Sequence, residues 1–464
     1  MSAPASRERN ALGGEAASPL GQYAWAMFDW ANQPYFTIVA SLIFAPYLAT
    51  TFVGEASRGQ TILSLAYGTV GLVAALASPV AGAIADASGA RKPWMLALSV
   101  VFFLAACGHW FAVPGAEDRI LPVMASFVVA NIALEMTVVF NNAMLPTIAP
   151  ASRLGTLSGI GYGIGYVGGL AALVLVLLAF SLPADGVLPW KPIFGLDPAA
   201  YEHVRIIPPL SVVWYAVFVA PLFLFTPDVP AIRTTIGKAV REGAARLLAT
   251  GRKLNRYGNV ARFLIARMIF TEGLNAIFVF GPVYAAGLFG WKASTLNIFG
   301  LVVLVFWALG AFVGGILDDR LGAKPTLYLA VGALIAGALL GVSLDRDAVF
   351  FFIPAQAVDA ARPLASPPEW LYLLAGVVMG LGAGPAQSAT RSLMGRLAPA
   401  EMMTEFYGLY ALSGKAASWV LPLVIAGLTS LTGSLRASFV AILCALVIGL
   451  VALVPVRVER ASAA

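Results

Sequence analysis

The stretch that decides the fold is "GAIADASGARK", residues 82 to 92, because a similar stretch, "GILDDRLGAK", recurs at residues 315 to 324. Both copies follow an apolar run, and both place a glycine, an aspartate, a second glycine and a cation at one spacing. These positions are Gly82, Asp86, Gly89 and Arg91 in the first copy, extended by Lys92, and Gly315, Asp319, Gly322 and Lys324 in the second. Every shared position is offset by 233, about half of the 464 residues, which indicates an internal duplication.

The composition around these copies is that of a membrane protein. Hydrophobic residues make up 60% of the chain and charged residues only 11%, with a mean hydropathy of +0.85. A soluble domain usually carries about 25% charged residues, so a soluble globular fold is excluded. Apolar runs of about 20 residues, long enough to span a bilayer as helices, recur along the whole sequence.

We predict an all-α, polytopic membrane protein with twelve transmembrane helices in two six-helix bundles. The expected spans are 22–50, 61–86, 93–113, 120–148, 155–182, 207–226, 260–288, 294–317, 326–344, 369–392, 404–430 and 435–456. They define four parts: a disordered cytoplasmic tail at 1–21, an N-terminal bundle at 22–226, an amphipathic cytoplasmic linker at 227–259, and a C-terminal bundle with a short tail at 260–464.

The distribution of Lys and Arg predicts the orientation. An even number of spans puts both termini on one side, and the cations concentrate in segments on that side, above all in residues 233 to 256. Cytoplasmic loops carry this excess, so we expect both termini to be cytoplasmic and the chain to lie in the cell inner (plasma) membrane. Basic inner loops are ordinary in membrane proteins, and we expect no nucleic-acid partner.

A second repeat follows the expected helices four and ten. Ala149-Pro150-Ala151 matches Ala398-Pro399-Ala400, and Gly159 matches Gly408. Two six-helix halves related by duplication are the organisation of alternating-access transporters, in which the substrate site lies between the halves at mid-membrane.

The duplicated motif has a physical interpretation. Gly82 and Gly315 lack side chains, so a neighbouring helix can approach closely. The two aspartates can accept hydrogen bonds from a facing helix N-terminus, or pair with nearby Arg or Lys side chains. Such contacts would hold the cytoplasmic side closed and break when it opens. The alternative is a polar turn that merely follows the charge bias of cytoplasmic loops.

These motifs resemble those of a known family. The pattern G-x-x-x-D-x-x-G-x-R-K in a twelve-helix chain resembles the major facilitator superfamily. "DWANQPYFTIVASLIFAPY", "MLPTIAP", "SGIGYGIGYVGG" and "RSLMGRLAPAEMMTEFYGLYALSGKAAS" resemble the branch of autophagy-related vacuolar amino-acid effluxers and their bacterial relatives. The resemblance implies the major facilitator fold and a substrate exporter, with amino acids as the suggested cargo in fungi.

Charged side chains inside the spans are costly, so each should face the protein interior or water. The set comprises three acids, Asp29, Glu135 and Glu272, and three bases, Arg267, Arg391 and Lys415. On helix four, Asn131, Glu135 and Asn142 lie within about 40° of one another on a helical wheel. This stripe is expected to line a cavity, although Asn and Glu also join packed helices by hydrogen bonds.

Further polar residues accompany these charges. The additional candidates for substrate binding or coupling are Asn32, Tyr162, Tyr166, Thr271, Asn275, Gln387 and Trp419. Three alternatives stay open: Arg391 as an anchor at the membrane face, the tyrosines as packing residues, and Asp29 as an interfacial acid near a helix start. In "WAMFDWANQPYF", Pro34 is expected to free the carbonyl of Trp30 and to bend the helix.

The function predicted from these residues is secondary active transport of a small polar solute, an amino acid or a similar zwitterion. No P-loop is present in the sequence, so an ion or substrate gradient would drive transport, and the three acids are candidates for proton coupling. Histidines and cysteines share no ligand spacing, so we expect no metal site, no cofactor and no enzyme activity, and we expect a monomer. The alternatives are a transporter of another organic solute and a non-transporting receptor or scaffold on the same fold.

Overall fold

The computed structural model describes residues 8–230, 232, 238, 241, 245, 257–291, 293–359, 362–434 and 436–458. Within these residues ten helices are long and apolar enough to cross a membrane, and two shorter apolar helices, Val420–Thr432 and Phe439–Ala452, follow them. The predicted all-α fold with twelve membrane helices is therefore confirmed. Most of the expected linker at 227–259, including its amphipathic helix, lies outside the described residues.

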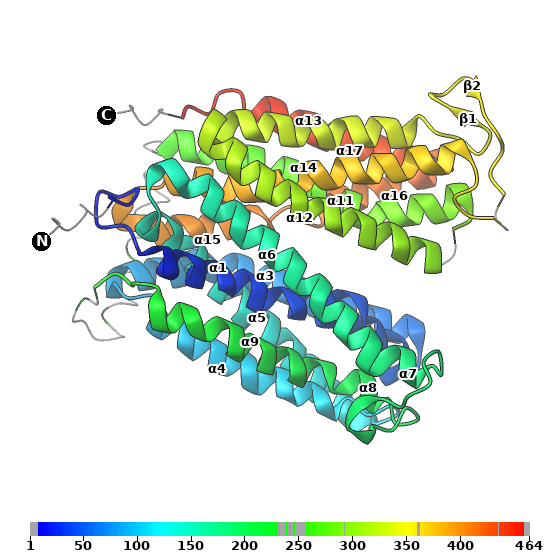
Figure 1. Cartoon of the computed structure of the whole chain (residues 1–464), viewed down its shortest axis with the longest axis horizontal. Helices are drawn as coiled ribbons and strands as arrows, with labels where there is room; N and C mark the ends of the chain where they lie inside the picture. The colour runs from blue at the N-terminus through cyan, green and yellow to red at the C-terminus, as the bar shows by residue number, and fades with distance from the viewer. Residues whose placement is uncertain are drawn as a thin grey trace, which may run out of the picture. The chain divides into compact units, whose positions relative to one another are not determined.

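The helices and strands are drawn in Figure 1. The α-helices before the linker are α1 (Pro19–Pro34), α2 (Phe44–Tyr47), α3 (Ala56–Ser88), α4 (Lys92–Gly108), α5 (Glu117–Ile148), α6 (Leu154–Val176), α7 (Leu182–Ala184), α8 (Glu202–Arg205) and α9 (Ile207–Phe225). Those after it are α11 (Gly258–Phe289), α12 (Ala293–Leu321), α13 (Ala323–Val342), α14 (Pro367–Leu397), α15 (Met403–Ser413), α16 (Val420–Thr432) and α17 (Arg436–Ala452). Short π or 3₁₀ segments occupy Tyr35–Leu42, Leu48–Phe52, His109–Phe111, Ala151–Arg153, Leu177–Ser181, Ile193–Gly195 and Ala400–Met402, and β1 (Ala348–Val349) pairs with β2 (Ile353–Pro354).

The chain divides into two compact units. Unit 1 comprises Met1–Pro150, Ile164–Leu248 and Pro399–Ala411, and unit 2 comprises Ala151–Gly163, Ala249–Ala398 and Leu412–Ala464. In unit 1, α1 packs on α9, and α5 packs on both α3 and α4; in unit 2, α14 packs on α12 and α13, and α11 packs on α17 (Figure 1). Each unit therefore contains one short segment from the opposite half of the sequence, and these two segments hold the starts of α6 and α15.

The proline in the first membrane helix frees the carbonyl that the sequence predicts. Pro34 is the last residue of α1, and the chain continues as a π-helical segment, Tyr35–Leu42. A proline removes the hydrogen bond to the carbonyl four residues earlier. Here the Trp30 carbonyl instead accepts a bond of 3.2 Å from the indole Nε1 of Trp214 on α9, whose ring stacks on that of Trp30.

The N-terminal tail, expected to be disordered, has structure from Glu8 onward. Residues 8–17 turn back on themselves and lie against the C-terminal end of α5. The backbone N–H of Ala11 donates to the carbonyl of Ala149, and that of Ala17 donates to Ile148, both at 2.9 Å. The last carbonyls of a helix lack partners within the helix, so this segment gains hydrogen bonds that its polar composition alone did not reveal.

The eleventh membrane helix, expected to be continuous over 404–430, is interrupted. α15 ends at Ser413 and α16 begins at Val420, with hydrogen-bonded turns between them. The intervening residues, "GKAASW", are mostly small or polar, and the Ser418 hydroxyl bonds to the Lys415 carbonyl at 2.9 Å. A serine side chain that bonds nearby backbone in this way competes with the helix.

Candidate functional site

The aspartate of the first motif copy caps a helix that lies far away in sequence. Asp86 stands near the end of α3, and its Oδ1 and Oδ2 accept hydrogen bonds from the backbone N–H groups of Thr404 (3.1 Å) and Glu405 (2.8 Å). These are the second and third residues of α15. We call this arrangement, all of it inside unit 1, the Asp86 cap.

The second copy repeats the arrangement inside unit 2. Asp319, near the end of α12, accepts hydrogen bonds of 2.7 Å from the backbone N–H groups of Gly155 and Thr156. These are the second and third residues of α6. We call this arrangement the Asp319 cap.

Both caps follow from the chemistry of helix ends. The first N–H groups of a helix have no partner within the helix, and the N-terminus carries a partial positive charge. A carboxylate placed there satisfies two donors and meets a favourable charge, for an N-cap effect of about 0.5–2 kcal/mol. Each cap is therefore strong enough to stabilise one arrangement and weak enough to break.

Glycines bring the backbones together beside the Asp86 cap. A Cβ on Gly82 would lie 2.3 Å from the carbonyl oxygen of Thr404, and one on Gly408 would lie 2.4 Å from that of Ser78. Contacts this short leave no room for any side chain, so only glycine allows α3 and α15 to pack at this distance.

The same packing recurs beside the Asp319 cap. A Cβ on Gly315 would lie 2.7 Å from the carbonyl oxygen of Gly155, and one on Gly159 would lie 2.5 Å from that of Ala311. These four residues occupy the positions equivalent to Gly82, Thr404, Gly408 and Ser78 under the two sequence repeats. The duplication thus preserved both the carboxylate and the close helix contact.

The second glycine of each motif copy forms the turn that follows. Gly89 has a φ of 86° and Gly322 a φ of 97°, in the region that side chains disfavour. Each glycine lets the chain reverse directly after the helix that carries the aspartate.

Of the two cations of the first copy, Arg91 contacts the Asp86 cap. The Arg91 Nε donates to the Thr404 hydroxyl at 2.8 Å, and its Nη2 lies 3.7 Å from the Asp86 carboxylate. Burial lowers the pKa of the Arg91 guanidinium, whereas the carboxylates of Asp86 and Asp228 raise it. Lys92 points elsewhere, with its Nζ donating to the Phe223 carbonyl at 3.0 Å.

The cation of the second copy does not pair with its aspartate. The Lys324 Nζ donates to the carbonyls of Val454 and Val456 just after α17, at 2.8 and 2.7 Å. Its place near Asp319 is taken by Arg396 of α14, whose Nη2 lies 3.4 Å from the carboxylate. Arg396 also pairs with the neighbouring buried Asp318. The sequence repeat predicted the aspartate but not its basic partner.

The polar residues of unit 1 lie on α1 and α5. Asp29 and Asn32 are buried on α1, and Asn142 is buried on α5, while Glu135 is half-buried. The Asn131 amide donates to the Tyr35 hydroxyl at 3.4 Å and to the Phe127 carbonyl at 2.8 Å.

One of these positions joins two segments, and another lies at a close helix approach. Asn131 links α5 to the π-helical segment after Pro34. Gly165 of α6 lies close to Asp29, since a Cβ there would be 3.2 Å from the Asp29 Cβ. Tyr166, one position further along α6, is also buried.

Arg391 is buried in unit 2 rather than placed at a membrane face. Its Nε donates to the Ser158 hydroxyl at 2.9 Å and its Nη2 to the Ser158 carbonyl at 2.6 Å. Its guanidinium carbon lies 4.0 Å above the ring of Tyr162. Arg391 therefore joins α14 to the first turns of α6, next to the Asp319 cap, and the anchor interpretation is wrong. Gln387, one turn away, is half-buried.

The remaining candidates of unit 2 gather on α11 and at the interruption between α15 and α16. The Arg267 Nη1 donates to the Ser413 hydroxyl at 2.7 Å, and Lys415 follows in the interruption. Glu272 is buried, and its Oε1 has no hydrogen-bond partner in the part of the chain that the structure describes. Thr271 is half-buried, whereas Asn275 and Trp419 are exposed.

Sequence reasoning missed the donors of both caps. Gly155 and Thr156 follow the first Ala-Pro-Ala repeat by a few residues, and Thr404 and Glu405 follow the second. A proline next to a helix start is a recognised boundary signal. Pairing the duplicated aspartates with the duplicated helix starts would have found them.

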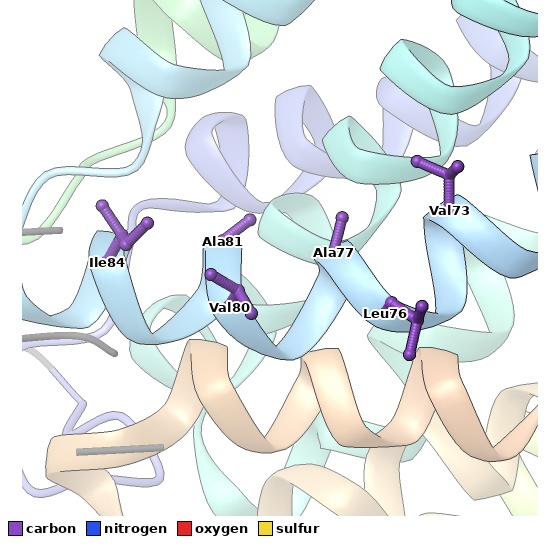
Figure 2. A pocket seen from close by; sticks show the side chains of 6 residues that line it. All are labelled: Val73, Leu76, Ala77, Val80, Ala81 and Ile84. Carbon is purple, nitrogen blue, oxygen red and sulfur yellow. The ribbon is translucent and has the colours of Figure 1, made fainter. Parts of the chain in front are cut away.

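A shallow hollow lies against α3 and has a different character. Its volume is about 460 Å³, and it is lined by Val73, Leu76, Ala77, Val80, Ala81 and Ile84, which Figure 2 shows along one helix. A lining of this kind carries no group that would bind a polar solute. Among the described residues, no cluster of three or more His, Cys, Asp or Glu side chains could hold a metal ion.

Comparison with known proteins identifies the family. The pattern of the family described as "Vacuole effluxer Atg22 like" matches residues 58–464. The chain belongs to this family. As an Atg22-like protein it is a transporter of the major facilitator superfamily, and not an enzyme.

Similar proteins support this assignment. The Atg22-like chain is 23% identical over 450 residues to the uncharacterized MFS-type transporter YxiO of Bacillus subtilis, covering 95% of each. It is 24% identical over 327 residues to autophagy-related protein 22-1 of Neosartorya fischeri, covering 68% of this chain and 50% of the fungal one. The chain thus spans about half the length of that fungal relative.

Solved structures show the same fold. The proton:xylose symporter XylE superposes with a TM-score of 0.67 at 13% identity, covering 93% of this chain and 94% of that one. The human organic anion transporter MFSD10 superposes with a TM-score of 0.63 at 14% identity, covering 94% and 100%.

Proposed function

We propose that this Atg22-like protein exports an amino acid or a similar zwitterion by alternating access. The observation that carries the proposal is the pair of caps: two duplicated aspartates each hold the start of a helix from the opposite half of the sequence. The glycines at each point of approach let the backbones meet closely, so each cap is a compact contact of a few hydrogen bonds. Reversible closure requires contacts that form and break as a unit, and the caps have that form.

The orientation follows from the charges. Both caps stand at the ends of α3 and α12 that the Lys and Arg bias assigns to the cytoplasm, together with both termini. We therefore propose that the caps lie at a gate on the cytoplasmic side. We also propose that the protein works as a monomer in the plasma membrane.

The solute class is inferred from the buried and half-buried charged side chains of each unit. Unit 2 carries Arg267 and Lys415, which suit a carboxylate. Unit 1 carries Asp29 and Glu135, which suit an ammonium group. The family is described as "Vacuole effluxer Atg22 like", which supports export.

Proton coupling would use one of the acids within the membrane helices. Glu135 lies on the polar stripe of α5, and Glu272 is buried with one oxygen unpartnered among the described residues. A carboxyl group that changes surroundings between two states changes its proton affinity, which couples proton and solute movement. If the Glu135→Gln protein transports with an unchanged pH dependence, Glu135 is not the coupling group, and Glu272→Gln becomes the decisive variant.

The test is a ligand screen followed by uptake. Binding to the native state alone raises apparent stability, so purified protein is screened by thermal shift against amino acids, peptides, sugars and nucleosides. Proteoliposomes are then tested for uptake of each stabilising solute, with and without a pH gradient. Stabilisation by amino acids with uptake supports the proposal. Stabilisation without uptake would identify a receptor instead.

A further inference from the structure

The connection between α13 and α14 carries an aromatic hairpin. β1 and β2 pair with Ala348 opposite Pro354 and Val349 opposite Ile353. The turn between them is therefore Phe350-Phe351-Phe352. These three side chains are 46%, 60% and 79% exposed.

The residues of this turn differ from those that tight turns usually contain. Phe350 has a φ of 51° and Phe351 a φ of 70°, the left-handed region in which turns normally use Gly, Asn or Asp. Strained backbone of this kind persists where the surrounding structure enforces it, and it concentrates at functional positions. Because the three rings are largely exposed, we expect them to contact something outside this chain.

Hydrogen bonds fasten the turn to the end of α13. The backbone N–H of Phe351 donates to the carbonyl of Ser343 at 2.7 Å, and Ser343 is the residue that follows the last one of α13. The Arg436 guanidinium fixes the start of the connection through the Leu344 carbonyl (3.0 Å) and the Asp345 carboxylate (2.8 Å). The turn is therefore fastened to the end of the membrane-spanning helix α13, and Figure 1 shows β1 and β2 in the connection that follows α13. The end of a spanning helix is where hydrocarbon gives way to lipid headgroups.

Unit 1 shows a similar feature in the connection between α6 and α9. The exposed Trp190 folds back so that its indole Nε1 donates to the carbonyl of Leu178, inside the spanning helix, at 3.2 Å. Phe194, exposed as well, has a φ of 67°. Here too an aromatic side chain is tied to the last turns of a membrane helix.

We infer that Phe350, Phe351 and Phe352 insert into the headgroup layer of the bilayer at the end of α13, as an interfacial anchor for unit 2. The partner is lipid because three exposed aromatic rings follow the end of a spanning helix, and exposed apolar side chains such as Phe enter the boundary between headgroups and acyl chains. The mixed charges just before β1, Asp345, Arg346 and Asp347, suit a zwitterionic headgroup layer.

The experiment measures depth directly. The chain has two cysteines, so Cys107→Ser and Cys444→Ser give a background for single labels. An environment-sensitive bimane is attached at Phe352→Cys and, as the matched control, at Gln356→Cys, which is exposed beyond β2. Each labelled protein is placed singly in phosphatidylcholine nanodiscs, and quenching by brominated lipid is compared with quenching by aqueous iodide.

We expect the label at Phe352 to be quenched severalfold more by brominated lipid than the label at Gln356, and severalfold less by iodide. Equal quenching at both positions, with full access to iodide, would overturn the inference. A label at Phe350→Cys repeats the measurement should Phe352→Cys fold poorly. A tip label shielded from iodide only in crowded proteoliposomes, and not in single-copy nanodiscs, would identify a second copy as the partner and would also overturn it.

Discussion

Removing the charge of Asp86 should separate α3 from α15, the contact that we propose as a gate, without unfolding the bundle. Asp86→Asn keeps one acceptor oxygen but loses one of two charge-assisted bonds, at 2.8 and 3.1 Å, and its charge at the helix N-terminus. Together these losses amount to about 1–2 kcal/mol, within the range given above for the whole cap. At about 1.4 kcal/mol per factor of ten, the open population should rise roughly 5- to 30-fold.

The assay is alkylation of a cysteine hidden by the closed contact. Ser78 is 1% exposed, with its carbonyl against Gly408 of α15 and its hydroxyl against Met136 of α5, so we expect Ser78→Cys in the cysteine-free background to react faster when α15 separates from α3. Its rate with a maleimide in nanodiscs should rise by the factor given above in Asp86→Asn. Asp185→Asn removes the same charge from an exposed connection and should leave the rate unchanged. A rate within twofold of the parent in Asp86→Asn would refute the role of the cap.

Three further changes test the packing. Gly82→Ala should lower the melting temperature by several degrees, because its Cβ would lie 2.3 Å from a carbonyl oxygen. The control is Gly71→Ala on the same helix, whose Cβ would meet nothing within 4 Å, so the melting temperature should stay the same or rise. Trp214→Phe should cost about 1 kcal/mol by leaving the partly buried Trp30 carbonyl without its indole donor. A smaller loss in the Pro34→Ala background, measured as a double-mutant cycle, would show that this carbonyl is the one freed by the proline. Arg391→Lys should lower thermal stability by several degrees, since lysine cannot reproduce two guanidinium bonds and a ring contact; an unchanged melting temperature would contradict the joining role.

The features predicted from the sequence share one property: their signal is local or repeated. Hydropathy predicted the spans, because each must cross about 30 Å of hydrocarbon whatever its neighbours are. The offset of 233 identified Asp86 and Asp319 together. The freed carbonyl of Trp30 follows from Pro34 four residues later, by covalent geometry alone.

The features that sequence reasoning missed depend on partners far apart in the chain. Arg391 meets Ser158 across 233 residues, and nothing in the pattern near either residue indicates the other. Trp214, the donor to Trp30, lies 184 residues away and reads as an ordinary apolar helix residue. The Lys324 side chain donates to two carbonyls just after α17 rather than pairing with Asp319, because a repeat preserves residue types but not every neighbour.

Solute counterflow in proteoliposomes tests the central claim most directly. Vesicles are loaded with a mixture of unlabelled amino acids and diluted into buffer with one labelled amino acid, and its transient accumulation is followed for the wild-type protein and for Asp86→Asn/Asp319→Asn. The account predicts accumulation for at least one amino acid by the wild-type protein and severalfold slower exchange by the double variant at equal folded protein. Absence of counterflow for every amino acid, or equal exchange by both proteins, would contradict it.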